Sequence, residues 1–126
     1  RKVEVGPKSI ISVANKYAGF YQCVGTFTHP TAGERPINEK KFLVPLTAFS
    51  CNIPAGDLGG SGYSVDIVVD PVTNAVTFKN GVPVDLLGST ALPSYFEPST
   101  GKFYLHYFYV GGSGNRVIDE VYTPII

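Results

Sequence analysis

The sequence predicts an all-β fold: an antiparallel meander of seven to eight strands closed into a barrel, with a β-sandwich as the alternative. Segments rich in aromatic and β-branched residues recur along the chain, which has 8 Tyr and 8 Phe among 126 residues. The 14 Gly and 10 Pro fall largely between these segments and are typical of tight turns. No stretch long enough for a helix repeats its apolar residues with a 3.6-residue period.

Composition and alternation place the expected strands along the chain. The segments expected to form strands cover residues 19–28, 41–49, 63–69, 75–79, 82–86, 102–110 and 115–123. Pro45 interrupts the second segment and cannot donate a ladder hydrogen bond, so this strand is expected to be an edge strand or to bulge there. Residues 3–13 either add another strand or belong to a linker.

Turn signals separate these segments. Residues 70–74 and 97–101 share one plan, in which proline sets the second turn position and Asn or Gly precedes the next strand. The first of them predicts a hairpin, and residues 111–114 predict another between the last two strands. Asn80-Gly81 predicts a two-residue turn. Residues 28–38 and 52–62 are expected to form the two long loops.

Length and charge limit the number of domains and the kind of partner. A chain of 126 residues and 13.5 kDa is enough for one core. We expect residues 16–126 to form one barrel domain and residues 1–15 to be a linker or an extra strand from an upstream domain. The 10 basic residues are balanced by 10 acidic ones, which argues against nucleic-acid binding. No apolar run approaches the ~20 residues of a membrane-spanning helix, and a chain starting at Arg1 is expected to be a trimmed or mature fragment.

The two cysteines and two histidines do not form a metal motif. Cys23 and Cys51 would face each other only if their strands pair as neighbours, and buried free thiols are favoured over a disulfide. His29 is expected to be exposed beside its loop. We expect no metal, no cofactor and no catalytic residue.

His106 is expected to face a carboxylate across the last hairpin. Its partner is Asp119 if Val110 pairs with Asn115, or Glu120 if the loop bulges by one residue. The sequence offers no nucleophile motif for this pair, so we interpret it as a satisfied pair on a sheet face and do not expect an enzyme. Arg116 is expected to be structural and to bond carbonyls or a nearby acid.

The penultimate strand segment, residues 102–110, carries large side chains on both faces. Phe103, Leu105, Tyr107 and Tyr109 share one face, and Tyr104, His106 and Phe108 share the other. These rings either fill the core or contact a ligand that is apolar at one end and hydrated at the other. The residues predicted to bind ligand are Phe103, Tyr104, His106, Tyr107, Phe108 and Tyr109.

The C-terminal third resembles the ending of a family of Bacteroidetes surface lipoproteins. The resemblance rests on residues 95–109 and 114–120, with further likeness in residues 17–21, 25–35 and 57–59. Glu97 stands where the family often has Asp or Asn. The resemblance implies a lipocalin-like barrel, sometimes described as lipid-binding, often encoded beside glycan-uptake machinery. It also implies export to the outer-membrane surface or periplasm, a lipid anchor outside this fragment and an upstream domain in the same chain.

Together these expectations favour a non-enzymatic ligand-binding module. A lipid or other hydrophobic ligand would need an empty interior lined by the Phe103 face, with a connected cavity of about 300 Å³ or more. A glycan would instead need Tyr104, Phe108 or loop aromatics on the outside. A purely structural domain would have neither feature.

Overall fold

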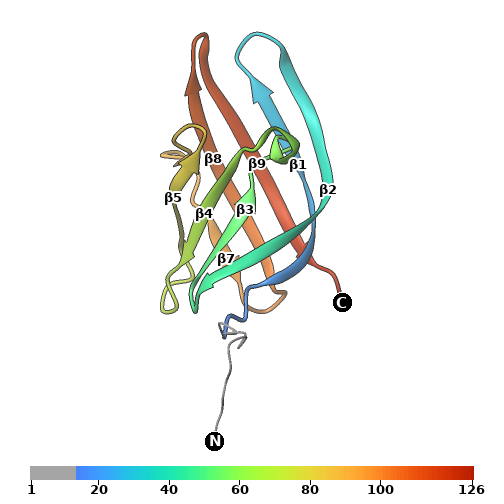
Figure 1. Ribbon diagram of the computed structural model, residues 1–126, viewed down its shortest axis with the longest axis vertical. Coiled ribbons are helices and arrows are strands. Elements are labelled where there is room, and N and C mark those ends of the chain that lie inside the picture. Colours follow the sequence, from blue (N-terminus) through green and yellow to red (C-terminus); the bar gives the residue numbers. More distant parts are fainter. Residues whose placement is uncertain (1–13) are drawn as a thin grey trace, which may run out of the picture.

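The computed structural model describes residues 14–126, which form a single antiparallel sheet curled into a barrel (Figure 1). The described strands are β1 (Gly19–His29), β2 (Gly33–Thr47), β3 (Ser50–Pro54), β4 (Ser64–Val69), β5 (Val76–Val82), β6 (Leu87–Gly88), β7 (Tyr95–Glu97), β8 (Lys102–Gly111) and β9 (Gly114–Pro124). One 3-10 turn, Gly59–Ser61, precedes β4. No helix in this part of the chain is long and apolar enough to cross a membrane. The all-β prediction and the barrel are confirmed.

The strands follow one another around the barrel as a meander. Their order is β5-β4-β3-β2-β1-β9-β8-β6, with β7 also paired to β8. The first and last strands join continuously, from Tyr21 opposite Pro124 to Thr28 opposite Val117. The circle is completed between β5 and β7 only by an isolated bridge between Ala75 and Tyr95. We call this incomplete closure, between β5 on one side and β6 and β7 on the other, the seam.

Several sequence-based turns are confirmed. The 70–74 turn joins β4 to β5, with Asn74 at φ 66° and the Asp70 carboxylate accepting the N–H of Val72. The 97–101 turn joins β7 to β8, and the last hairpin joins Gly111 to Gly114. β2 pairs with β1 and β3, but its ladder to β1 ends at Leu43, so Pro45 pairs only with Cys51 of β3. The register shift between Pro45 and Thr47 confirms the irregularity predicted there.

Three local predictions are wrong. The strand expected at residues 82–86 does not form, because β5 ends at Val82 and the next strand, β6, covers only Leu87–Gly88. The expected loop 28–38 is mostly strand, because β1 runs to His29 and β2 starts at Gly33, leaving a short connection. The expected turn at Asn80-Gly81 lies inside β5, where Asn80 has φ 55° and a register shift lets Val82 pair with Ser64. The physical reason is that β5 continues to pair with β4 on both sides of Asn80, so the positive φ produces a register shift within the strand and not a turn. Residues 3–13, considered for another strand, lie outside the described residues.

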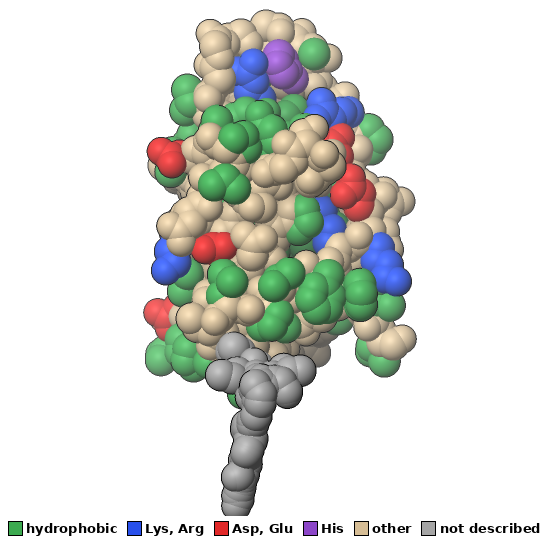
Figure 2. Space-filling model, viewed as in Figure 1, with side chains coloured by type: hydrophobic (Ala, Val, Ile, Leu, Met, Phe, Trp, Pro, Cys, Tyr) green, Lys and Arg blue, Asp and Glu red, His purple; other side chains and the backbone are tan. Residues whose placement is uncertain are grey.

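The barrel interior is packed with aromatic and aliphatic side chains. The largest fully buried side chains include Tyr17, Phe27, Phe103, Tyr107 and Tyr122. The outer face also carries exposed apolar side chains. Phe20 on β1 and Phe42 on β2 are exposed and in edge contact, with ring centroids 4.8 Å apart. Figure 2 shows hydrophobic side chains gathered over the lower part of β2.

Candidate functional site

The strand with the predicted ligand residues, β8, divides them between the two faces of the barrel wall. Phe103 and Tyr107 point inward and are fully buried. Tyr104, His106 and Phe108 alternate with them and are half-buried on the outer face. These five residues therefore form two groups on opposite sides of one strand, and no single ligand surface includes them all.

Tyr109, the sixth predicted residue, continues the inward row at the upper end of β8 and is half-buried. Its ring centroid lies 5.5 Å from that of Tyr63 and 6.4 Å from that of Phe27. Tyr109 therefore packs against other aromatic rings where the row approaches the barrel end.

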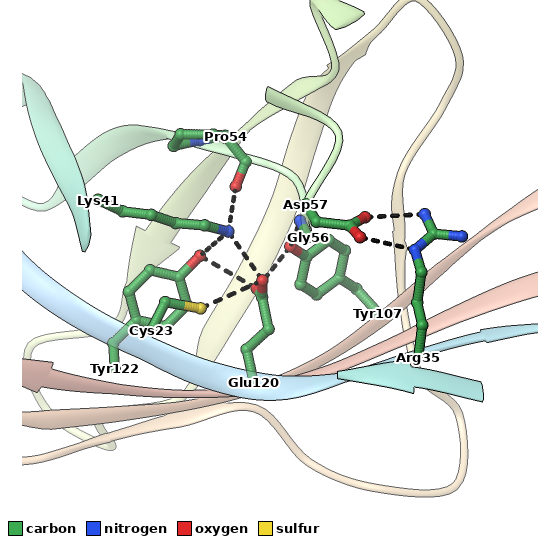
Figure 3. Close-up of polar contacts among 9 residues, drawn as sticks. All are labelled: Cys23, Arg35, Lys41, Pro54, Gly56, Asp57, Tyr107, Glu120 and Tyr122. Carbon is green, nitrogen blue, oxygen red and sulfur yellow. Dashed lines mark hydrogen bonds and ion pairs between the residues drawn. The ribbon is translucent and has the colours of Figure 1, made fainter. Parts of the chain in front are cut away.

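Inward-pointing side chains of several strands form a buried polar network inside the barrel (Figure 3). The Glu120 carboxylate accepts hydrogen bonds from the hydroxyls of Tyr107 at 2.6 Å and Tyr122 at 3.0 Å. Lys41 Nζ lies 2.8 Å from Glu120 Oε2 and also donates to the carbonyl of Pro54 at 3.0 Å. Cys23 Sγ is 3.3 Å from Glu120 Oε2. A buried ion pair with these extra partners leaves few polar atoms unsatisfied, which is what burial of charge requires.

The protonation states of this network follow from burial. Burial and the adjacent Glu120 carboxylate raise the pKa values of Tyr107 and Tyr122 well above the usual range. Burial, followed by the charge of Glu120, also raises the pKa of the Cys23 thiol. The phenols and the thiol therefore stay protonated at neutral pH and act as donors to Glu120. The network holds strands together and fills the interior.

The two cysteines are buried free thiols. Cys23 lies on β1, whereas Cys51 lies on β3, and β2 separates these strands. The condition under which they would have faced each other, that their strands are neighbours, is not met. Among the described residues no group of three or more His, Cys, Asp or Glu side chains is placed to hold a metal ion.

On the outer face, Tyr104 of β8 stacks on Tyr95 of β7. Their ring centroids are 4.9 Å apart and the planes differ by 21°. Tyr95 is 39% exposed, and the Tyr104 hydroxyl lies 3.5 Å from Glu97 Oε1. This pair forms a partly exposed aromatic cluster beside a carboxylate on the outside of the barrel.

His106 of β8 and Asp119 of β9 meet across the same outer face. Val110 pairs with Asn115, so His106 falls opposite Asp119, the first of the two predicted registers. Nδ1 of His106 lies 2.7 Å from Oδ1 of Asp119. The hydroxyl of Ser94 contacts the backbone of His106, accepting its N–H at 2.8 Å, rather than its ring. The imidazole is thus oriented by a carboxylate and sits between the rings at positions 104 and 108.

A groove at the seam is the feature that sequence reasoning missed. It has a volume of about 370 Å³ and is lined by residues 75–78 on one side and by Gly88, Ser89, Pro93 and Ser94 on the other. Its inner wall is the ring of Phe78, which stacks on buried Tyr107 with centroids 4.9 Å apart. Glycine at position 88 keeps the opposite wall close, because a Cβ there would lie 3.3 Å from the Phe78 ring.

The chemistry of the seam groove is mixed but uncharged. Val76, Phe78 and Pro93 supply apolar surface, and Thr77, Ser89 and Ser94 supply hydroxyls. The N–H of Val76 donates to the carbonyl of Ser94 at 2.9 Å, so the backbone groups of Phe78, two residues on, point to the same side. No ladder joins Phe78 to β6 in the described part of the chain. The groove therefore combines an aromatic wall with a strand edge that is not part of a ladder.

No sequence signal marked this groove, because its two walls are separated along the chain and meet only when the barrel closes. The Ser and Pro residues of the segment 89–94, which forms part of one wall, are typical of ordinary loops and do not indicate a binding site.

Comparison with known proteins identifies a family for nearly the whole chain. No curated protein and no solved structure matches the sequence. A family model that describes a C-terminal domain of Bacteroidetes type matches residues 10–123. This match spans both faces of β8, the buried network and the seam groove. The chain therefore belongs to this family of Bacteroidetes-type C-terminal domains.

Proposed function

We propose that this domain is a non-enzymatic ligand-binding module whose seam groove takes the apolar part of a lipid or another hydrophobic molecule. The observation that carries the proposal is the groove itself. Its volume of about 370 Å³ falls in the range of roughly 300–1,000 Å³ typical of small-molecule pockets. Its lining has an aromatic wall, hydroxyls at fixed positions and no charged side chain.

The proposal places the ligand in the barrel wall instead of the barrel interior. Phe103, Leu105 and Tyr107, which would have to line an interior site, are fully buried against other side chains. The Lys41–Glu120 pair and its partners occupy the space beside them. A ligand entering there would have to displace a buried ion pair, which is costly, whereas the seam groove is already open.

The wider setting is part of the same proposal. The resemblance of residues 95–109 and 114–120 to surface lipoproteins, and membership of a family of C-terminal domains, support an exported chain with an upstream domain and a lipid anchor. In that setting the domain would present its groove at the outer-membrane surface or in the periplasm. The lipocalin-like description and the link to glycan utilisation belong to this proposal too.

Titration of the domain with medium-chain fatty acids and the corresponding alcohols tests the groove. The chain has 8 Tyr and no Trp, so tyrosine emission reports binding, and Tyr107 lies directly behind the groove wall. Ala75→Phe places a ring at an exposed groove position and is expected to weaken binding roughly tenfold, the cost of losing the apolar contact. Val72→Phe adds the same ring at a position that is 86% exposed in the 70–74 turn and serves as the control.

Equal affinities of the two variants would contradict the groove as the site. A second comparison tests charge at exposed Thr77. Thr77→Glu should weaken the binding of fatty acids more than that of alcohols, because the added carboxylate repels the carboxylate of the acid. Thr77→Gln, which adds no charge, should change the affinity for both ligands by the same factor. Failure of every hydrophobic ligand to change the emission would reject the proposed function.

A glycan ligand is the second candidate, and the outer aromatic face favours it. The stacked Tyr95–Tyr104 pair offers exposed aromatic surface, and Glu97 and the His106–Asp119 pair supply hydrogen-bonding groups nearby. Sugar rings combine an apolar face with a polar edge, so this arrangement suits them.

The Tyr95→Ala variant separates the two candidates. If a glycan binds the outer face, this variant should weaken oligosaccharide binding by roughly tenfold and leave fatty-acid binding unchanged. Ala75→Phe should show the reverse pattern. A domain that binds neither host or plant oligosaccharides nor hydrophobic ligands would be a structural module.

A further inference from the structure

Two hairpins meet at one end of the barrel, far along the chain from each other. The β1–β2 and β8–β9 connections lie side by side in Figure 1. They are in contact, since a Cβ placed on Gly114 would lie 3.3 Å from Cβ of Pro30. Figure 2 shows a histidine and a basic side chain next to each other at the upper end of the molecule. At this end of the barrel His29, at the end of β1, and Arg116, on β9, lie within hydrogen-bond distance of each other, and both are half-buried.

The turn after β1 fixes which nitrogen of His29 carries the proton. The backbone N–H groups of Thr31 and Ala32 donate to His29 Nδ1 at 3.2 Å and 3.1 Å. A backbone N–H can only donate, so Nδ1 must be the unprotonated acceptor. In the neutral ring the proton therefore lies on Nε2, which becomes a donor. The expected exposed loop histidine is instead a half-buried residue with a defined tautomer.

The guanidinium of Arg116 is held in place by the last hairpin. Its Nη1 donates to the carbonyl of Gly114 at 2.8 Å, which confirms the predicted bond to a carbonyl. The group lies against Gly111, where an added Cβ would fall 1.7 Å from Nη1. The other terminal nitrogen, Nη2, lies 3.2 Å from Nε2 of His29.

This approach brings two donors together. A guanidinium has five N–H donors and no acceptor, and Nε2 of His29 already carries its proton. Nη2 and Nε2 therefore cannot satisfy one another, and both N–H groups need an oxygen. Within the described part of the chain, no carboxylate forms an ion pair with Arg116. Among residues 14–126 the ion pairs within 4.0 Å join Arg35 to Asp57, Lys41 to Glu120 and His106 to Asp119, and none includes Arg116.

We propose that His29 Nε2–H and Arg116 Nη2–H together bind one oxygen of an oxyanion, the carboxylate or phosphate group of a ligand. An anionic oxygen accepts both hydrogen bonds and compensates the guanidinium charge, which a neutral oxygen cannot do. This site is at the hairpin end of the barrel and uses none of the residues that line the seam groove. Its test is therefore independent of the proposed function.

Nuclear magnetic resonance of the histidine rings tests the proposal directly. The protein, labelled with ¹⁵N in its histidines, is titrated with acetate and with inorganic phosphate at about pH 8 and constant ionic strength. We expect an unprotonated Nδ1 and a protonated Nε2 in His29 before any addition. Both anions should then shift the Nε2–H signal saturably. His106, whose Nδ1 is bonded to Asp119, is the internal control and should stay unshifted.

Two variants remove one donor each. His29→Asn keeps an oxygen that can accept the N–H groups of the turn, as asparagine does in Asx turns, and removes the Nε2 donor. Arg116→Gln removes the guanidinium. Each should weaken phosphate binding, followed by backbone amide shifts, by roughly tenfold, the loss of one charge-assisted hydrogen bond. Lys79→Gln removes one positive charge from exposed β5 and should leave the affinity unchanged.

Pairs of acids and neutral analogues identify the source of the oxyanion. Glucuronate with glucose, octanoate with octanol, and glycerol phosphate with glycerol represent acidic sugars, fatty acids and lipid headgroups. In each pair the acid should bind and the neutral partner should not, and the tightest acid names the source. A saturable shift that persists in His29→Asn, or no saturable shift with any acid, would overturn the proposal and leave a water molecule between the two donors.

Discussion

Glu120 shows how one residue's role depends on register. The sequence left either Asp119 or Glu120 opposite His106, and the β8–β9 pairing assigns that place to Asp119. A residue next to an outward one points inward in a strand, so Glu120 lies in the interior at 1% exposure. It can remain there as a carboxylate because Lys41, two phenols and a thiol surround it. These partners come from four strands, β1, β2, β8 and β9, so no local sequence pattern could reveal the cluster.

The buried Lys41–Glu120 ion pair predicts that losing a charge at position 41 lowers stability much more than losing one at the neighbouring position 40. Lys41→Met removes the cation and leaves the Glu120 carboxylate unpaired, so we expect a loss of about 3–5 kcal/mol in the free energy of unfolding. Lys40→Met removes the same charge from the exposed neighbour on β2 and should cost less than about 0.5 kcal/mol. Urea unfolding of both variants measures the difference.

The double variant Lys41→Met with Glu120→Gln completes the test. Removing both charges should recover part of the loss, because the desolvation cost of an unpaired carboxylate disappears. Similar losses for the Lys40 and Lys41 variants would mean that Lys41 does not stabilise Glu120.

The thiols make a second prediction at the residue level. Burial raises the pKa of Cys51 to about 11, and it raises that of Cys23 further. A raised pKa lowers the thiolate fraction at any given pH, and the thiolate is the reactive form. We expect neither cysteine to react with an aromatic disulfide reagent at about pH 8 in the folded protein, and both to react in urea. Rapid labelling of the folded protein would show that the strands carrying them open readily.

At the scale of elements, sequence reasoning succeeded where the signal was local. The 70–74 turn combines an acceptor at Asp70 with a residue that tolerates positive φ at Asn74, and the hairpin follows. It failed at Asn80, where the same kind of signal occurs inside a strand. The difference lies in the partner: Val82 finds Ser64 on β4, and this long-range pair keeps the strand going past the apparent turn. Tertiary pairing can override a turn propensity in this way.

The β1–β9 contact makes a prediction at the same scale. Gly25 of β1 lies opposite Glu120, and a Cβ there would fall 1.9 Å from the Asp119 carbonyl oxygen. Because that oxygen belongs to backbone, Gly25→Ala must push β1 from β9 and should cost about 3 kcal/mol or more. Gly60→Ala, at a position with nothing within 4 Å, is the control and should be nearly neutral. Thermal unfolding of the two variants checks this, and a neutral Gly25→Ala would show that β1 and β9 can shift freely.

At the scale of the whole molecule, the candidate ligand site follows from how the barrel closes. A meander that closes into a barrel must join strands that are far apart in the chain. Here the first strand, β1, and the last strand, β9, are joined by a continuous ladder. The weak junction falls instead between β5 and the short strands β6 and β7. The β8 residues could be singled out from sequence because they are contiguous and aromatic. The groove could not, because its position depends on which junction of the circle is left incomplete.

The incomplete junction also predicts where the barrel opens first. Across the seam, the N–H of Val76 donates to Ser94 and the N–H of Phe96 donates to Asn74, each at 2.9 Å. These isolated bonds lack the neighbouring ladder bonds that protect β1 and β9, so they should break in a local opening with a free energy well below that of global unfolding. We expect hydrogen exchange at the amides of Val76 and Phe96 to be faster than at the paired amides of β1 and β9, and to slow when a ligand fills the groove. Exchange at the same rate in all these positions would mean that the seam opens only when the whole barrel unfolds, and then the groove would be a rigid part of the wall.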